Sequence, residues 1–299
     1  MIFKAMTMLG RAALAVAAVV AATPAAAAIS VVDDSGARVT LQQPARRVIS
    51  MAPHVTELLF AAGGGARVVG AINFSDYPEA ARKLPVVGSS SALDMERVLA
   101  LKPDLLVVWQ SGNTARQLEQ LRQTGIPIFY SEPTRLEHVA DSLIRFGQLL
   151  GTEPAAQEAA QNFRSKIAAL EARYARRAPV RVFYQIWDKP LYTLNNSQIA
   201  SDAIRLCGGV NVFGKLAVKA PVVSTEAVLE QDPEAIIGSL RDDAADAGLQ
   251  LWRPYKALLA VRHGNLFSPP ESLTRAGPRM VAGVADLCEK LELARQRRR

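Results

Sequence analysis

Residues 154–177 read PAAQEAAQNFRSKIAALEARYARR, a stretch with no glycine and no strand signal. Its apolar side chains at Phe163, Ile167, Leu170 and Tyr174 recur at the spacing of one helix face. At 1.5 Å per residue, a helix of about 22 residues would span about 33 Å. The stretch therefore predicts one long, rigid helix that connects two lobes.

On both sides of this helix, short apolar runs alternate with helical patterns, which is typical of α/β lobes with mainly parallel sheets. Strands are expected at Val48–Met51, Val68–Ala71, Leu105–Trp109, Ile126–Tyr130 and Val180–Tyr184. Helices are expected near Thr56 and at Met95–Leu101, Ala115–Gln123 and Leu136–Leu150. The expected division is a leader at 1–28, a first lobe at 29–152, the connecting helix at 153–178 and a second lobe at 179–299.

A weak internal repeat relates the two halves. Asp94 and Glu96 open one unit, and Ser224 and Glu226 open the other, at a constant offset of 130 residues. Each unit has a helix-capping residue, a glutamate in the first turn, a short helix, and then a proline before an apolar strand. The repeat on either side of the long helix predicts two related lobes.

The first 28 residues are typical of a secretory signal peptide. Lys4 and Arg11 are the only charges before Asp33, eleven apolar residues follow Arg11, and alanines end the segment at Ala28. The apolar run is shorter than the ~20 residues of a membrane span, so export and cleavage are favoured over an N-terminal anchor. The mature protein is therefore expected to be soluble and exported.

The positive charge of the chain says little about its partners. Its 35 Lys and Arg residues exceed its 28 Asp and Glu residues, and losing the leader lowers the formal net charge from +7 to +5. Much of the excess lies in a C-terminal cluster, Arg295 and Arg297–Arg299, which we expect to be a solvated tail. Without a basic stripe interleaved with aromatic residues, nucleic-acid binding is not supported.

The two cysteines, Cys207 and Cys288, are 81 residues apart. Because oxidation is available outside the cytoplasm, a disulfide is favoured over two buried thiols. In the chain-entropy model, a loop of this length gives ~4 kcal/mol of stabilisation.

Catalytic and metal-binding patterns are weak. The sequence has no G-x-S-x-G, no phosphate-binding loop and no G-x-G-x-x-G after a strand, which makes an exported two-domain α/β enzyme the less favoured alternative. His54, His138 and His263 would form a metal-ion receptor only by converging in space. His54 follows a strand in Met51-Ala52-Pro53-His54, where α/β folds place ligand loops.

Several short motifs, taken in order, resemble the substrate-binding proteins of ABC importers for corrinoids and iron chelates. Ser75–Pro78 resembles the cobalamin-binding branch of that family. The resemblance runs from about residue 33 to 292 and rests on Asp33–Leu41, Pro44–Ser50, Pro53–Gly63, Ser75–Pro78, Ala100–Leu105, Cys207–Phe213 and Ala276–Arg279.

The resemblance implies a periplasmic, monomeric binding protein that catalyses nothing, needs no cofactor and delivers its ligand to an importer permease. It implies that Glu96 and Glu226, one on each lobe, pair with arginines of the permease. Each glutamate also lies in the first turn of a helix, where a carboxylate gains ~0.3–1 kcal/mol from the helix dipole. The family also has a disulfide that aligns with Cys207 and Cys288.

The resemblance places a corrinoid between the lobes. A corrin is a broad, mostly apolar disc with amide edges, so aromatic walls suit it. Phe74 and Trp109 match aromatic positions of the family, whereas Ser90 and Ala220 stand where cobalamin-binding members have tryptophan. The candidate ligand-binding residues are Pro53, His54, Phe74, Ser75, Asp76, Tyr77, Ser90, Trp109, Gly112, Ile186, Trp187, Tyr192, Ala220 and Arg275.

Other ligands of the same family stay open at this point. Haem or a ferric siderophore is the alternative, and Arg275 and Arg279 are the cations that could face a charged siderophore. His54 is a candidate for contact with the metal centre of the ligand, and no direct metal site of the protein itself is expected.

Overall fold

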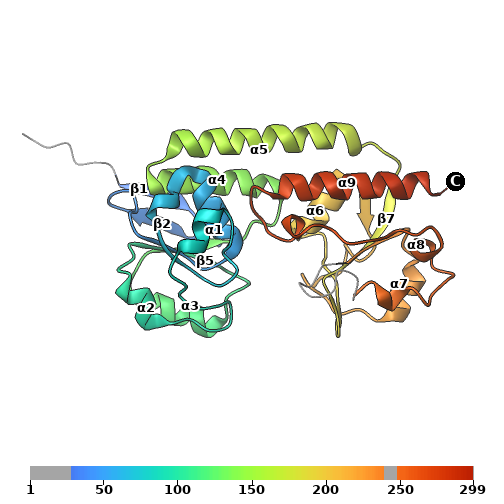
Figure 1. Ribbon diagram of the computed structural model, residues 1–299, viewed down its shortest axis with the longest axis horizontal. Helices are drawn as coiled ribbons and strands as arrows, with labels where there is room; N and C mark the ends of the chain where they lie inside the picture. The colour runs from blue at the N-terminus through green and yellow to red at the C-terminus, as the bar shows by residue number, and fades with distance from the viewer. Residues whose placement is uncertain (1–27, 239–247, 299) are drawn as a thin grey trace, which may run out of the picture.

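The computed structural model describes residues 28–238 and 248–298. Two lobes lie side by side, and α5 (Glu153–Tyr174) runs along the top of both (Figure 1). The expected leader at 1–28 lies outside the described residues except for Ala28. Within the described ranges, no helix combines the length and the apolar character needed to cross a membrane.

The first lobe is built on a parallel sheet in the order β4-β3-β5-β6. Its strands are β3 (Val48–Ser50), β4 (Val68–Ala71), β5 (Leu105–Trp109) and β6 (Ile128–Ser131). Its helices are α1 (Pro53–Leu59), α2 (Met95–Ala100), α3 (Ala115–Arg122) and α4 (Leu136–Leu150). An antiparallel hairpin of β1 (Ile29–Val32) and β2 (Arg38–Leu41) precedes them.

The second lobe repeats this arrangement with the order β10-β7-β11-β12, again all parallel. Its strands are β7 (Val180–Gln185), β10 (Gly209–Asn211), β11 (Ala235–Gly238) and β12 (Leu266–Phe267), with a small hairpin of β8 (Trp187–Asp188) and β9 (Leu191–Tyr192). Its helices are α6 (Ile199–Leu206), α7 (Thr225–Gln231), α8 (Leu259–Arg262) and α9 (Met280–Gln296).

The internal repeat of the sequence corresponds to the same element pair in each lobe, α2 with β5 and α7 with β11. The Asp94 carboxylate accepts the backbone N–H of Arg97 at 3.0 Å, and the Ser224 hydroxyl accepts that of Ala227 at 3.1 Å. Each cap therefore satisfies one of the free N–H groups at a helix start. In both sheets the strand that follows is an inner strand, so the lobes share one topology.

The predicted long helix is α5, which ends at Tyr174. Gly151, in the left-handed region at φ 62°, ends α4 and lets the chain turn into α5. Phe163 and Tyr174 are buried, and they belong to a single apolar core that extends from the first sheet through α4 and α5 to α9. The lobes are thus joined by packed side chains as well as by the backbone.

Strand β6 differs most from its sequence prediction, whereas β3 and β7 differ by one residue at one end. Strand β6 begins at Ile128 rather than Ile126, and it reaches Ser131. Pro127 has no N–H to donate to a sheet ladder, and only its carbonyl takes part, accepting the N–H of Leu106 at 2.9 Å. The strand consequently begins two residues and ends one residue later than expected.

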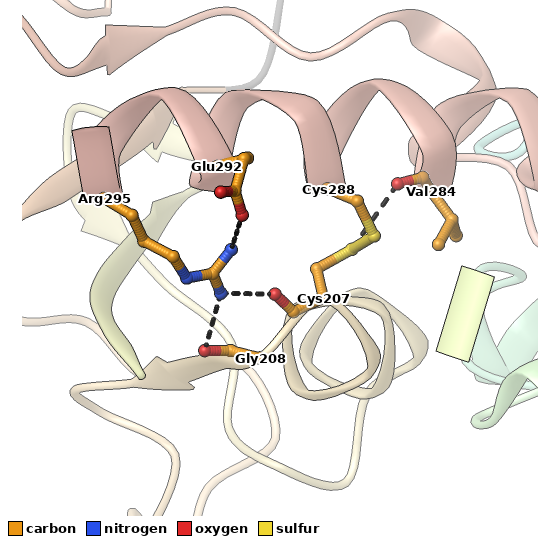
Figure 2. The surroundings of a disulfide bond; sticks show 6 residues. All are labelled: Cys207, Gly208, Val284, Cys288, Glu292 and Arg295. Carbon is orange, nitrogen blue, oxygen red and sulfur yellow. Dashed lines mark hydrogen bonds and ion pairs between the residues drawn. A yellow bond between two sulfur atoms is a disulfide. The ribbon is translucent and has the colours of Figure 1, made fainter. Parts of the chain in front are cut away.

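The last helix closes the second lobe and corrects the prediction of a solvated arginine tail. The predicted disulfide joins Cys207 at the end of α6 to Cys288 in α9, with Cα atoms 4.7 Å apart. Beside it, the Arg295 guanidinium donates to the carbonyls of Cys207 at 2.7 Å and Gly208 at 3.1 Å, and pairs with Glu292 at 3.1 Å (Figure 2). Carbonyls at a helix end lack intrahelical partners, which explains why they attract this guanidinium.

The next arginines are exposed, but they also bind groups of the lobe and do not form a free tail. Arg297 donates to the Gly264 carbonyl at 2.6 Å, and Arg298 pairs with Glu234 at 2.5 Å. Arg299 lies outside the described residues. The positive charge at the C-terminus therefore serves largely to fasten α9 to its own lobe.

Candidate ligand-binding site

A cavity of about 310 Å³ lies between the two lobes. From the first lobe it is lined by Pro53, His54, Trp109, Glu132 and Pro133. From the second lobe it is lined by Tyr184, Ile186, Leu194, Gln198, Ile199, Ala200, Leu273, Thr274, Arg275 and Ala276. The first-lobe residues end or closely follow the strands β3, β5 and β6, and open α/β sheets hold ligands at these carboxyl ends.

Five of the candidate residues line this cavity: Pro53, His54, Trp109, Ile186 and Arg275. The first four lie at or just after strand ends in the two lobes, and Arg275 lies in the segment before α9. The interpretation that the ligand loops follow the strands accounts for the first four. Arg275 has no such local signal and was identified only through the family resemblance.

The remaining candidates lie outside the lining. Phe74 and Trp187 are strongly exposed for aromatic side chains, at 69% and 41%, and Tyr77 is also exposed. Tyr192 pairs with Trp187 in the β8–β9 hairpin, and Ser75 is buried, accepting a hydrogen bond from the Thr56 hydroxyl at 3.0 Å. Ser90 and Ala220 are exposed. Asp76 and Gly112 each contact a residue of the cavity wall, as described below.

His54 lies in the first turn of α1, directly after Pro53, which suits the start of a helix. Its side chain is only 6% exposed, and its ring meets that of Trp109 edge to face with centroids 5.4 Å apart. Burial lowers the pKa of His54 to about 4, and the positive charge of Arg275 acts in the same direction. The imidazole is therefore neutral at pH 7 and keeps one nitrogen able to accept a hydrogen bond or a metal.

Trp109 is held in place by the turn that follows β5. Its backbone N–H donates to the Asn113 side chain at 3.1 Å. A Cβ added at Gly112 would lie 1.8 Å from Cε3 of Trp109, so only glycine fits beneath the ring. Gly112, predicted as a ligand-binding residue, is thus a support for the Trp109 ring.

A cluster of ion pairs crosses between the lobes at one edge of the cavity. Glu57 of α1, with its side chain 1% exposed, accepts two hydrogen bonds from Arg279, at 2.6 and 3.0 Å. Arg275 lies 3.6 Å from Glu57, pairs with Asp76 at 2.8 Å and also pairs with Glu271. The Arg279 guanidinium lies 4.3 Å from the centre of the Tyr77 ring.

The ion pairs shift the pKa values of Arg279 and Asp76 toward their charged forms. The hydrogen bonds that Arg279 donates to the Glu57 carboxylate raise the pKa of Arg279 above its usual value, although partial burial opposes this. Burial alone would raise the pKa of Asp76, but the hydrogen bond and charge of Arg275 outweigh it and hold that pKa below its usual value. Arg275 is therefore a neutralised cation, not a free one.

The sequence reasoning missed most of the second-lobe lining and also Glu132 and Pro133. The rule that ligand loops follow parallel strands could have found this pair, because both come directly after β6. Gln198–Ala200 belong to the start of α6, and Leu273 precedes α9, where no motif marks them. Their role depends on how the lobes meet, which no local pattern encodes.

The three histidines do not form a metal centre. Among residues 28–238 and 248–298, no group of three or more His, Cys, Asp or Glu side chains is arranged to hold a metal ion. His138 contacts Thr134 at the start of α4, and His263 follows α8. The metal-receptor alternative, which needed them to converge with His54, is therefore wrong.

Glu96 and Glu226 occupy matching places in the two lobes. Both are exposed, and each is the second residue of its helix. Helices α2 and α7 both lie on the side of the molecule opposite α5 (Figure 1). Hydrogen bonds from its own backbone and from Ser224 lower the pKa of the Glu226 carboxyl, so it is ionised at neutral pH.

Comparison with known proteins identifies the family. The model of the family described as "Periplasmic binding protein" matches residues 48–273. The vitamin B12-binding protein of Yersinia pestis (strain Pestoides F) is 38% identical over 249 residues, which cover 83% of this chain and 87% of that protein.

Solved structures agree with this assignment. The periplasmic vitamin B12-binding protein of Vibrio cholerae matches with a TM-score of 0.78 at 37% identity, over 84% of this chain and 98% of that one. A periplasmic haem-binding protein from Pseudomonas aeruginosa matches with a TM-score of 0.71 at 25% identity, over 82% and 91%. These relatives are named as binding proteins, not as enzymes. On this extent of similarity, the chain belongs to the periplasmic binding protein family.

Proposed function

We propose that this protein captures cobalamin or a related corrinoid between its lobes in the periplasm and delivers it to an ABC importer. One observation carries the proposal: an inter-lobe cavity lined by the partly exposed ring of Trp109, in a chain 38% identical to a vitamin B12-binding protein. Exposed aromatic surface next to a concave site is a common mark of ligand binding.

The size of the cavity indicates how a corrinoid would sit. At about 310 Å³ it is at the lower end of the range for small-molecule sites, ~300–1,000 Å³. A corrinoid is larger, so part of it would extend beyond the cavity over Phe74, Trp109 and Trp187. The apolar faces of these rings suit the flat corrin, and the polar groups nearby suit its amide edges.

Haem is the second candidate, and one observation favours it. His54 presents a buried, neutral imidazole to the cavity, and such a nitrogen can bind a metal centre. A haem-binding relative shares the fold at 25% identity. Coordination by His54 predicts that His54→Ala changes the visible spectrum of the bound ligand, and an unchanged spectrum would remove this role.

The proposal extends to export and docking. Residues 1–28 act as the signal that sends the chain to the periplasm, and the mature protein works as a monomer. Glu96 and Glu226 dock on arginines of the importer permease. This is supported by their exposure and by the position of α2 and α7 on one side of the molecule.

The direct test is calorimetric titration of the mature protein with cyanocobalamin, haemin and a ferric hydroxamate siderophore. We expect sub-micromolar binding of cyanocobalamin and weaker binding of the other two. Tight binding of haemin with no heat from cyanocobalamin would replace the corrinoid assignment by the haem one.

A further inference from the structure

The charges around the cavity are not balanced. Arg275 and Glu132 are the charged residues of the lining, besides the neutral His54. Arg275 already has three carboxylate partners, Asp76, Glu271 and Glu57. Arg279, the next cation, is bound to Glu57. Arg275 and Arg279 therefore share three carboxylates, those of Glu57, Asp76 and Glu271, and Glu132 is a fourth.

Glu132 adds a fourth carboxylate, which forms no ion pair with the described residues. Its two oxygens are held by Ser111, whose backbone N–H donates at 2.9 Å and whose hydroxyl donates at 2.8 Å. Within the part of the chain that the structure describes, no lysine, arginine or histidine nitrogen forms an ion pair with it. Both hydrogen bonds come from neutral groups of Ser111, so neither brings a positive charge next to this carboxylate at the cavity wall.

This arrangement has consequences for a ligand. A ligand carboxylate placed here would lose water and meet uncompensated negative charge, which is unfavourable on both counts. An amide N–H, in contrast, can donate to a carboxylate that is already fixed in position. Specificity often depends on such repulsion of the wrong ligand.

We propose that the cleft selects its ligand by charge, and that Glu132 is a specificity-determining residue for this selection. The cleft favours neutral or cationic corrinoids whose edges carry carboxamides. It disfavours corrins with free carboxylates at the same edges, and for the same reason it disfavours the propionates of haem, a different macrocycle. This inference rests on the proposed corrinoid function and names the chemical class of corrinoid that the site accepts.

The test uses ligands that differ in a single group. Cyanocobalamin and its three monocarboxylic acids, in which one side-chain carboxamide is hydrolysed to a carboxylate, share the same ring and axial ligands. At low ionic strength, we expect at least one of the acids to bind wild-type protein about fivefold or more weakly than cyanocobalamin. In Glu132→Gln, which keeps the shape of the side chain, the same acid should lose most of this penalty.

Glu158→Gln is the matched control, because it makes the same change of net charge on the exposed surface of α5. In Glu158→Gln, the acid should bind as much more weakly than cyanocobalamin as it does in the wild type. A second measurement needs no variant: in the wild type the penalty should shrink as salt rises from 0.02 to about 0.5 M, because screening weakens charge repulsion.

The outcomes separate the two proposals. If cyanocobalamin and all three acids bind wild type equally, the charge selection is refuted and the corrinoid function stands. If the acid still binds Glu132→Gln as much more weakly than cyanocobalamin, Glu132 does not determine the charge selection. If cyanocobalamin itself does not bind, the proposed function fails, and this inference fails with it.

Discussion

Glu57 in the first lobe and Arg279 in the second lobe form a two-pronged ion pair, with atoms 2.6 and 3.0 Å apart, although 222 residues separate them. The carboxylate is almost completely buried. A buried charge that loses its partner keeps the cost of leaving water, so breaking such a pair is strongly destabilising. The pair therefore fastens the lobes together at the edge of the cavity.

Removing Arg279 alone should destabilise the fold by about 3–5 kcal/mol, because Glu57 would stay buried without its main partner. Urea unfolding of Arg279→Met, followed by circular dichroism, measures this. Glu57→Leu in the same background should recover part of the loss. A double variant whose loss equals the sum of the single ones would show that the two residues are not coupled.

Trp109→Ala should weaken cyanocobalamin binding by about tenfold or more, as expected for an aromatic anchor at the centre of a site. The side chain is 37% exposed, so the fold should lose little stability. Calorimetry of the ligand and thermal melting of the free protein check the two expectations. Val210→Ala, at an exposed apolar position of β10, is the control and should change neither.

Gly112→Ala should displace the Trp109 ring, because the added methyl group would overlap it. We expect altered tryptophan emission and weaker ligand binding with the overall fold retained. The chain has three tryptophans, so the measurement is repeated in a Trp109→Phe background. The emission change should disappear there, and its persistence would mean that another tryptophan had moved.

The buried His54 predicts a pH effect on stability. Its pKa in the fold is about 4, below the usual histidine value of 6.5, so the unfolded chain takes up a proton first as pH falls. The stability from neutral His54 is complete above pH 6.5 and is lost as pH falls toward 4, by about 2 kcal/mol at pH 5. Urea unfolding at pH 7.5 and pH 5 should show this loss, and His54→Gln should lose less between the same two values. If the wild type and His54→Gln lose the same stability between pH 7.5 and pH 5, His54 is not the cause of the pH effect.

Glu96→Ala combined with Glu226→Ala should impair transport and leave ligand affinity unchanged. Both side chains are exposed and lie away from the cavity lining, so binding does not depend on them. Uptake of labelled cyanocobalamin by vesicles containing the importer measures the first effect, and calorimetry measures the second. Glu230→Ala, also exposed on α7, is the control. A collapse of ligand affinity would exclude a pure docking role.

The elements that were predictable from sequence have local causes. Helix α4 covers Leu136–Leu150 as expected because its apolar stripe is regular and Gly151 ends it. The Cys207–Cys288 disulfide followed from oxidising export and from the resemblance together. Pro127 places the start of β6 two residues later than the apolar run predicts, at Ile128.

The rest depended on contacts between distant segments. The partners of Arg275 come from α1, from the loop after β4 and from its own turn, so its neutralisation could not be recognised from one motif. The sequence predicts a free tail for the arginines after Leu293 because their acceptors are carbonyls and carboxylates from distant parts of the second lobe, which no local pattern reveals. For the same reason, the lining residues that the sequence predicts are mainly those that follow strands, and most of the second-lobe lining is not among them.

The position of Cys288 in the last helix also sets an order of assembly for an exported chain. The strands of the first sheet end at Ser131, so that lobe has all its sheet residues soon after translocation begins. The second sheet needs β12 near residue 267, and its covalent closure needs residue 288. If the chain is exported as proposed, the disulfide can close only when almost the whole polypeptide has emerged, and a chain cut short before α9 would leave Cys207 without Cys288.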